Sequence, residues 1–210
     1  GEKINILLQN RNIPIILGGG HETVYGHYLG VRSAVGSTSK IGIVNIDAHF
    51  DMRLDNQGAS SGTMFYQILN EDRKANYIVI GIQAFGNTKA LFERAQAFQV
   101  KYVLEEQLTE QPEEIWKQQI QDFIDKQDVV IATLCMDVVN ASAAPGVSAP
   151  SVFGLSPQLV RKLLRYIMQF NKVISFDICE VNPSVDEGER TAKLAANFVN
   201  EVVYQLAKKH

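Results

Sequence analysis

The chain has 210 residues, of which 46% are hydrophobic and 20% are charged, and its formal net charge is −3. It is long enough to bury a sizeable core, and it lacks the basic excess needed to bind nucleic acid or an anionic membrane. No apolar run approaches the ~20 residues of a membrane span. Two cysteines, Cys135 and Cys179, are too few for a disulfide framework. We therefore expect a cytoplasmic protein with neither nucleic-acid nor membrane partners.

Short apolar runs rich in β-branched residues alternate with longer helical patterns along the chain. Strands are predicted at residues 13–17, 41–46, 77–82, 100–104, 129–134 and 172–178. Helices are predicted at residues 2–10, 22–35, 63–70, 88–98, 113–126, 157–169 and 189–208, with Ser156 as an N-cap before Pro157. The strands are apolar throughout, which is typical of parallel strands covered on both faces. We expect an α/β fold with a parallel sheet between helices, formed as a single domain by residues 1–210.

Side chains that can bind metals or act in catalysis follow four of the six predicted strands. An open parallel sheet binds ligands beyond the carboxyl ends of its strands. The four groups are His21 after three glycines, the segment Asp47-Ala48-His49-Phe50-Asp51, Cys135 with Asp137, and Asp177 with Cys179 and Glu180. Two loops rich in small residues, 55–62 and 141–154, are expected to contribute to the same edge.

The strongest single motif is Asp47-x-His49-x-Asp51. In extended backbone, residues two and four positions apart point to one side, so two carboxylates and an imidazole would meet there. They would repel unless a cation lay among them. Mixed oxygen and nitrogen ligands suit Mn²⁺, Zn²⁺, Fe²⁺ or Ni²⁺ better than Ca²⁺. The alternative is a solvated acidic turn, which the apolar character of the preceding strand disfavours.

Three further residues have two interpretations each. A histidine that follows a glycine run is commonly a hydrogen-bonded loop residue. The neighbouring Asp47 motif instead favours His21 as a metal ligand. The glycines before it fit neither a Walker loop nor a dinucleotide fingerprint. His27 lies inside the next predicted helix and is expected to be structural. Glu180 can bind a cationic substrate group or accept hydrogen bonds from local N–H groups, and spacing alone leaves both open.

The motifs together resemble the ureohydrolase superfamily, which includes arginase, agmatinase and formimidoylglutamase. They occur in the family's order, between about His21 and Ala196. The matching segments are Gly18-Gly19-Gly20-His21, Asp47-Ala48-His49-Phe50-Asp51, Asp137 with the Pro145-Gly146-Val147-Ser148-Ala149-Pro150 loop, and Glu180-Val181-Asn182-Pro183. Details in residues 20–30, Asp51-x-Arg53, residues 60–65 and residues 144–150 are most similar to the formimidoylglutamase branch.

The resemblance implies a three-layer α/β/α fold with a mainly parallel sheet and a binuclear metal site. The small-molecule substrate would be N-formimidoyl-L-glutamate, hydrolysed to L-glutamate and formamide in histidine degradation. In the family two Mn²⁺ ions hold the attacking hydroxide. Mapped onto this chain, His21 and Asp51 would bind one ion, His49 and Asp137 would bind the other, and Asp47 would bridge them. Asp51 and Glu180 are the expected catalytic residues, and Glu180 would hold the cationic head of the substrate.

Two residues depart from the family pattern. Cys135 stands where the family has an aspartate that bridges both metals, and its single soft sulfur favours Zn²⁺ or partial occupancy over two Mn²⁺ ions. Ser61 stands where arginase and agmatinase have a proton-shuttling histidine, which argues against those two activities. Family members run to roughly 300 residues, so we expect about 90 N-terminal residues to be absent, including an early strand of the sheet, which would expose apolar surface and an unpaired edge. A fragment, a proteolysed form or an obligate homo-oligomer would each explain this.

The alternatives are a metal-poor, non-catalytic protein of the arginase fold and another amidino hydrolase, such as an agmatinase-like enzyme. Arg53 is expected to hold a substrate carboxylate, with Ser61 and its loop supplying hydroxyl and N–H groups. Its alternative is a surface arginine paired with Asp51 or Asp55.

Overall fold

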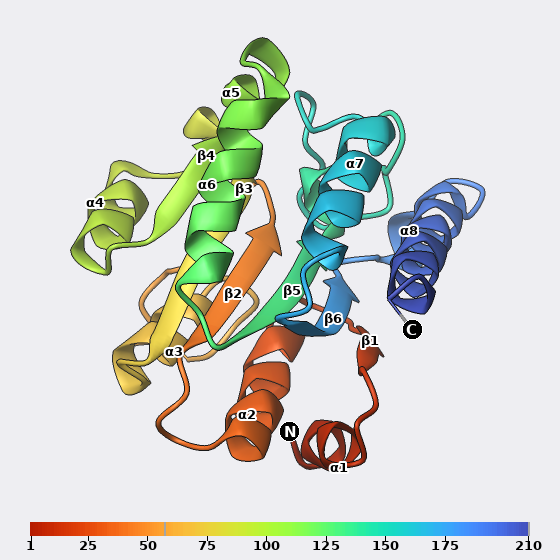
Figure 1. Ribbon diagram of the computed structural model, residues 1–210. Coiled ribbons are helices and arrows are strands. Elements are labelled where there is room, and N and C mark those ends of the chain that lie inside the picture. Colours follow the sequence, from red (N-terminus) through yellow and green to blue (C-terminus); the bar gives the residue numbers. More distant parts are fainter. Residues whose placement is uncertain (57, 210) are drawn as a thin grey trace.

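Six parallel strands form the centre of the computed structural model, which describes residues 1–56 and 58–209 (Figure 1). Their order across the sheet is β1-β6-β5-β2-β3-β4. The strands are β1 (Ile15–Leu17), β2 (Ile41–Ile46), β3 (Ala75–Ile82), β4 (Lys101–Leu104), β5 (Val129–Cys135) and β6 (Val173–Cys179). Every predicted strand is present, and the all-parallel pairing confirms the predicted fold class.

Eight α-helices precede, connect or follow the strands in the part of the chain that the structure describes. They are α1 (Glu2–Gln9), α2 (Thr23–Val35), α3 (Met64–Glu71), α4 (Lys89–Ala97), α5 (Glu105–Glu110), α6 (Glu113–Asp125), α7 (Pro157–Met168) and α8 (Arg190–Ala207). Seven of them match predicted helices. The N-cap of α7 is as predicted, since Ser156 Oγ accepts a hydrogen bond from the Leu159 N–H at 3.2 Å. The six-residue α5 was not predicted, because one and a half turns are too few to show a helical period.

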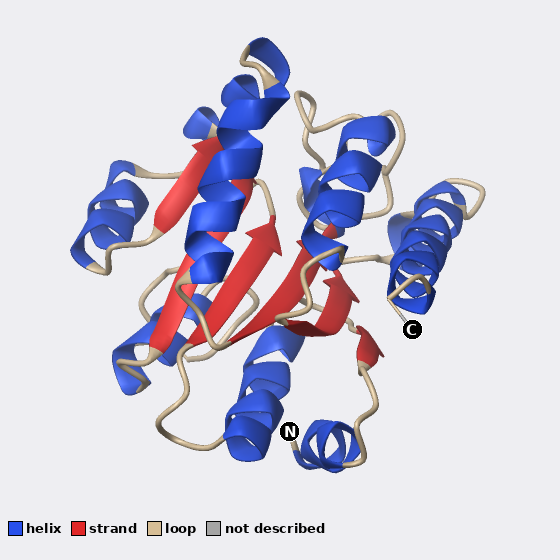
Figure 2. Cartoon of the chain, viewed as in Figure 1, coloured by secondary structure: helices blue, strands red, loops and turns tan. Residues whose placement is uncertain are grey.

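The helices cover both faces of the sheet and give the three layers expected (Figure 2). On one face α5 to α8 bury apolar side chains such as Trp116, Leu163 and Phe198 against the strands. On the other face α2, α3 and α4 bury Val31, Phe65 and Ala95, with α1 at their margin. Figure 1 shows α6 and α7 in front of the strands and α3 behind them. Burying a large apolar side chain stabilises the fold by roughly 1.5–3 kcal/mol, so the two cores hold the sheet edge in place.

The strand register brings four chain segments to one edge of the sheet. Ile46 of β2 pairs with Leu134 of β5, and Cys135 of β5 pairs with Cys179 of β6. Leu17 of β1 pairs with Ile178 of β6. Because all strands are parallel, the residues that follow β1, β2, β5 and β6 emerge side by side.

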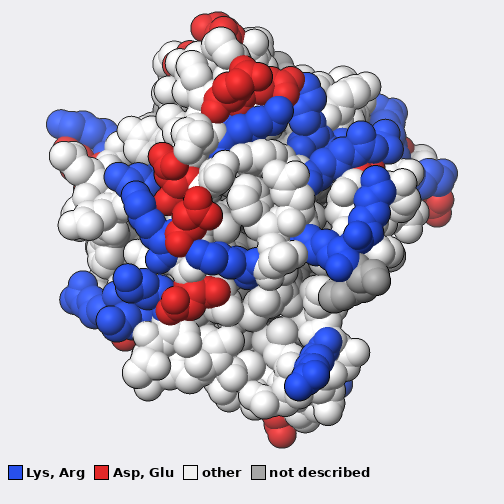
Figure 3. Space-filling view, viewed as in Figure 1, with Lys and Arg blue, Asp and Glu red and all other residues white. Residues whose placement is uncertain are grey.

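Basic and acidic side chains are interspersed on the face that Figure 3 shows, in keeping with the small net charge. No helix within the described residues is long and apolar enough to cross a membrane.

Candidate metal centre

Two histidines and three aspartates converge where β1, β2 and β5 end. Nδ1 of His21 lies 3.0 Å from Oδ2 of Asp47 and 3.0 Å from Oδ2 of Asp51. Nδ1 of His49 lies 3.1 Å from Oδ2 of Asp137 and 3.6 Å from Oδ1 of Asp47. Asp47 therefore faces one histidine with each of its two oxygens, and it stands between two groups of candidate ligands.

Cys135 joins the first of these groups. His21, Asp47 and Cys135 bring one ligand atom each to within 4.8 Å of one another, and Asp47, His49 and Asp137 do the same. Cys135 Sγ lies 2.9 Å from Oδ1 of Asp137, two residues further on. Both cysteines are free and buried, although Cys135 and Cys179 are direct neighbours on adjacent strands. The thiol of Cys135 thus lies among the carboxylates.

The charges in this cluster are balanced by protons on the two histidines. Burial lowers the pKa of His49, but hydrogen bonds to Asp137 and Asp47 outweigh it and raise this pKa to about 11. The pKa of His21 is raised in the same way by Asp47 and Asp51 against the effect of burial. Burial, together with the charge of Asp47, raises the pKa of Asp51 to about 7. Such a cluster needs positive charge at its centre, and a divalent cation can supply it in place of the protons.

Asp47 is held by neighbours that the sequence motif did not include. The side-chain amide of Asn45 donates to Oδ2 of Asp47 at 3.0 Å and lies 2.8 Å from the hydroxyl of Tyr77. The backbone N–H of His49 donates to Oδ1 of Asp47 at 2.8 Å. Asn45 is a fully buried polar residue inside an otherwise apolar strand, and that contrast was the sequence signal for its role.

Asn87 fixes the turn that carries His49 and Asp51. Its Oδ1 accepts from the N–H of Phe50 at 3.0 Å, and its Nδ2 donates to the carbonyls of Ala48 and Gln83 at 2.9 Å each. No feature of the sequence around Asn87 marks this role, because its two partners in the turn, Ala48 and Phe50, lie 39 and 37 residues earlier.

Two non-glycine residues of the site have left-handed backbone. Asp51 has φ of 49° and Glu180 has φ of 71°. Backbone strain of this kind is common at functional sites. Oε1 of Glu180 accepts from the His21 N–H at 2.8 Å, and the Glu180 N–H donates to the Gly19 carbonyl at 2.8 Å. Burial raises the pKa of Glu180. Within residues 1–56 and 58–209, the hydrogen bond to its carboxylate engages Oε1 and leaves Oε2 free.

A cleft of about 390 Å³ opens beside the cluster. Glu180 and four of the clustered residues line it together with both small-residue loops. The lining residues are His49, Asp51, Arg53, Ser61, Gly62, Gly86, Asn87, Thr88, Leu91, Cys135, Asp137, Ser148, Ala149 and Glu180.

Arg53 lies at the exposed side of this cleft. Its guanidinium packs against Gly62, at a place where a Cβ atom would collide with it, and its backbone N–H donates to the Gly62 carbonyl at 2.8 Å. In the described part of the chain Arg53 forms no ion pair with Asp51 or Asp55. The alternative interpretation of Arg53 as an arginine paired with those residues thus finds no support.

The six-stranded parallel sheet and the cluster of candidate metal ligands at the carboxyl ends of its strands agree with the arginase fold. A family model described as the Arginase family matches residues 1–204, and the chain belongs to this family. Formimidoylglutamase of Geobacillus sp. (strain WCH70) is 59% identical over 203 residues, which are 97% of this chain and 62% of that protein. Formimidoylglutamase of Lysinibacillus sphaericus (strain C3-41) is 52% identical over 98% of this chain and 64% of its own length. The chain therefore spans somewhat less than two thirds of these relatives.

Solved structures agree on the fold. Formimidoylglutamase from Bacillus subtilis has a TM-score of 0.89 at 26% identity and covers 98% of this chain and 65% of its own. A Trypanosoma cruzi formiminoglutamase variant, solved with Mn²⁺, has a TM-score of 0.87 at 22% identity, over 98% of this chain and 68% of its own.

Proposed function

We propose that the chain carries the catalytic centre of a formimidoylglutamase, which converts N-formimidoyl-L-glutamate and water to L-glutamate and formamide. The observation that carries the proposal is Asp47, which faces His21 with one oxygen and His49 with the other inside a cluster of three aspartates. The names of relatives up to 59% identical support the choice of substrate.

The donor set fits two divalent cations. His21, Asp47, Asp51 and Cys135 would hold one, and Asp47, His49 and Asp137 would hold the other. We propose Mn²⁺, the ion in the T. cruzi structures, with Zn²⁺ as the competitor that the sulfur of Cys135 favours. Such ions, when bound, lower the pKa of a shared water and polarise the amidine.

The remaining residues of the cleft bind and orient the substrate. The oxygen of Glu180 that the His21 N–H leaves free would accept a charge-assisted hydrogen bond from an N–H group of the cationic formimino head. Arg53 and Ser61 lie on the loop side of the cleft, where the two substrate carboxylates require positive charge and hydroxyl donors. Oδ2 of Asp51 contacts Nδ1 of His21, and the other ring nitrogen of His21, Nε2, contacts Thr133. Asp51 therefore helps to orient the His21 ring.

The test is a substrate panel on the chelator-treated chain supplied with Mn²⁺, Zn²⁺ or no metal. Formamide release is expected from formimidoylglutamate with Mn²⁺, and Asp47→Ala should abolish it. Asp122→Ala, which changes an exposed aspartate of α6, is the control and should keep full activity. Equal kcat/KM for arginine, agmatine or guanidinobutyrate, or full activity of Asp47→Ala, would contradict the proposal.

A further inference from the structure

A chain of buried polar side chains runs from His21 away from the cleft. Nε2 of His21 lies 2.9 Å from Oγ1 of Thr133, and this hydroxyl donates to Oδ1 of Asp177 at 2.6 Å. Oδ2 of Asp177 lies 2.6 Å from Nδ1 of His27. All four side chains are at most 1% exposed. Polar groups buried this deeply are costly unless they are paired, so the arrangement needs a reason.

The fold places the members of this chain directly opposite one another. Thr133 of β5 and Asp177 of β6 are paired across the sheet. His21 follows β1, and His27 lies on α2, which packs on the same face of the sheet. None of Thr133, Asp177 and His27 lines the cleft, so they are not candidates for ligands or substrate contacts.

The direction of the hydrogen bonds requires a proton on Nε2 of His21, so the nitrogen that can give up its proton to a cation is Nδ1. A threonine hydroxyl has a single hydrogen, and an ionised carboxylate can only accept. Because the Thr133 hydroxyl donates to Asp177, it can offer His21 only a lone pair. Nε2 of His21 must then be the N–H donor, and Nδ1 is left to face Asp47 and Asp51.

Asp177 is in turn fixed as an acceptor. Its Oδ1 also accepts from the thiol of Cys179 at 3.3 Å, and its Oδ2 accepts from Nδ1 of His27. The other ring nitrogen of His27, Nε2, is buried and has no hydrogen-bond partner within the described residues. Its hydrogen bond to Asp177 is therefore the one polar contact the structure gives this ring.

We infer that His27, Asp177 and Thr133 are positioning residues that hold His21 as its Nε2–H tautomer and so present Nδ1 to a divalent cation. The inference rests on the proposed metal centre. It adds three residues that never touch the cation, and it gives His27 a function beyond filling space in the core. Outer partners of metal-bound histidines typically change metal affinity by about 10- to 100-fold.

The experiment measures Mn²⁺ affinity, by electron paramagnetic resonance of free Mn²⁺, on two matched pairs of variants. Thr133→Val removes the hydroxyl at constant size, and Thr133→Ser keeps it. His27→Leu removes the donor, and His27→Asn keeps an amide nitrogen close to the position of Nδ1. We expect about 10- to 100-fold weaker binding for the valine and leucine variants. The serine and asparagine variants should bind as the wild type does.

Normal Mn²⁺ affinity in Thr133→Ser and His27→Asn would show that the weaker binding of the other two variants comes from the lost hydrogen bond. Circular dichroism and urea unfolding check directly that all four variants are folded. A second measurement needs no variant: nitrogen chemical shifts of the Zn²⁺-loaded wild type should show His21 metal-bound at Nδ1 and protonated at Nε2. Wild-type Mn²⁺ affinity in Thr133→Val and His27→Leu, or metal at Nε2, would overturn the positioning role alone. Absence of any cation binding by the wild type would overturn the metal centre and this inference together.

Discussion

Sγ of Cys135 lies 2.9 Å from Oδ1 of Asp137, so the thiol donates a hydrogen bond to the carboxylate. Burial raises the pKa of this thiol, and the charges of Asp137 and Asp47 raise it further. Without a cation the sulfur keeps its proton, and binding a metal through it would release that proton.

Replacing Cys135 by aspartate should raise the affinity for Mn²⁺ and lower the preference for Zn²⁺. A carboxylate offers two hard oxygens where the thiolate offers one soft sulfur. Titration of the metal-free variant with each ion measures both changes. Cys135→Ser, which removes the sulfur without adding a carboxylate, is the control and should not gain Mn²⁺ affinity. Unchanged or weaker Mn²⁺ binding by Cys135→Asp would show that this position does not ligate.

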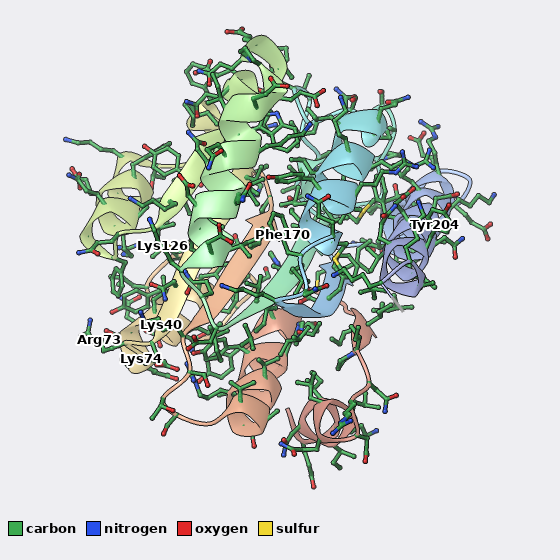
Figure 4. All side chains as sticks on the ribbon, in the orientation of Figure 1. Lys40, Arg73, Lys74, Lys126, Phe170 and Tyr204 are labelled. Atoms are coloured by element: carbon green, nitrogen blue, oxygen red, sulfur yellow. The ribbon has the colours of Figure 1, made fainter. Side chains whose placement is uncertain are left out.

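Arg53→Ala should reduce kcat/KM for formimidoylglutamate by about 10- to 100-fold, because a charge-assisted pair with a substrate carboxylate is lost. An amidine with the same head group but no carboxylates should be hydrolysed by Arg53→Ala and by the wild type with the same kcat/KM. Arg73→Ala is the control, since Figure 4 shows Arg73 beside Lys40 and Lys74 near the start of β2 and β3, at the opposite edge of the sheet. An equal loss on both substrates would mean that Arg53 supports the fold or the metals.

Asn87→Ala should lower the free energy of unfolding by about 1–3 kcal/mol, because a buried N–H and two carbonyls lose their partner. The turn that carries His49 and Asp51 should loosen, and Mn²⁺ should bind more weakly. Urea unfolding of the metal-free protein and Mn²⁺ titration give the two numbers. Asn171→Ala removes an exposed asparagine whose side chain forms no hydrogen bond within the described residues, and it should stay within about 0.5 kcal/mol. Equal unfolding free energies and equal Mn²⁺ affinities in the two variants would argue against a role for Asn87 in the site.

Glu201 should make the stability of the α7–α8 pair depend on pH. Arg165 lowers the pKa of this carboxyl against the effect of burial, and with Arg161 and Gln205 it brings the pKa from 4.5 to about 2. A lowered carboxyl pKa stabilises the fold fully above the unfolded value and less as pH falls through the folded value.

The measurement compares the unfolding free energies of the wild type and Glu201→Gln, both without metal. Their difference should be constant between pH 7 and pH 5 and should shrink as pH falls from 4.5 toward 2. Gln158→Ala, at an exposed position of α7, removes no ionisable group and should show no such trend. A difference that does not vary with pH would refute the assignment.

Much of the site could be predicted because parallel strands end at one edge. The residues after β1, β2 and β5 were expected to meet there, and His21, Asp47, His49, Asp51 and Asp137 do lie together. The helices with a clear apolar period were also predictable, whereas α5 was too short to show one. Residues 1–210 as a single domain remain a prediction.

Asp177 was singled out as a polar residue at a strand end, but the roles of the supporting residues could not be predicted, because their partners are distant in the sequence. Thr133 and Asp177 lie in apolar strands 44 residues apart, and only the pairing of β5 with β6 brings them together. His27 was expected to be structural, and its contact with Asp177 comes from a segment 150 residues away. Strand order decides such contacts, and nothing local in the sequence encodes it.

Among the described strands, β1 pairs only with β6. This pairing joins Ile15 to Phe176, which are separated by most of the sequence. Pairing residues so far apart closes a long loop, which costs chain entropy. On the ribosome, Asp47, His49 and Asp137 can come together once β2 and β5 pair, while His21 must wait for residues 173–179 to emerge and insert. In the proposed centre, the ligand group of Asp47, His49 and Asp137 would thus be assembled during synthesis before the group that includes His21.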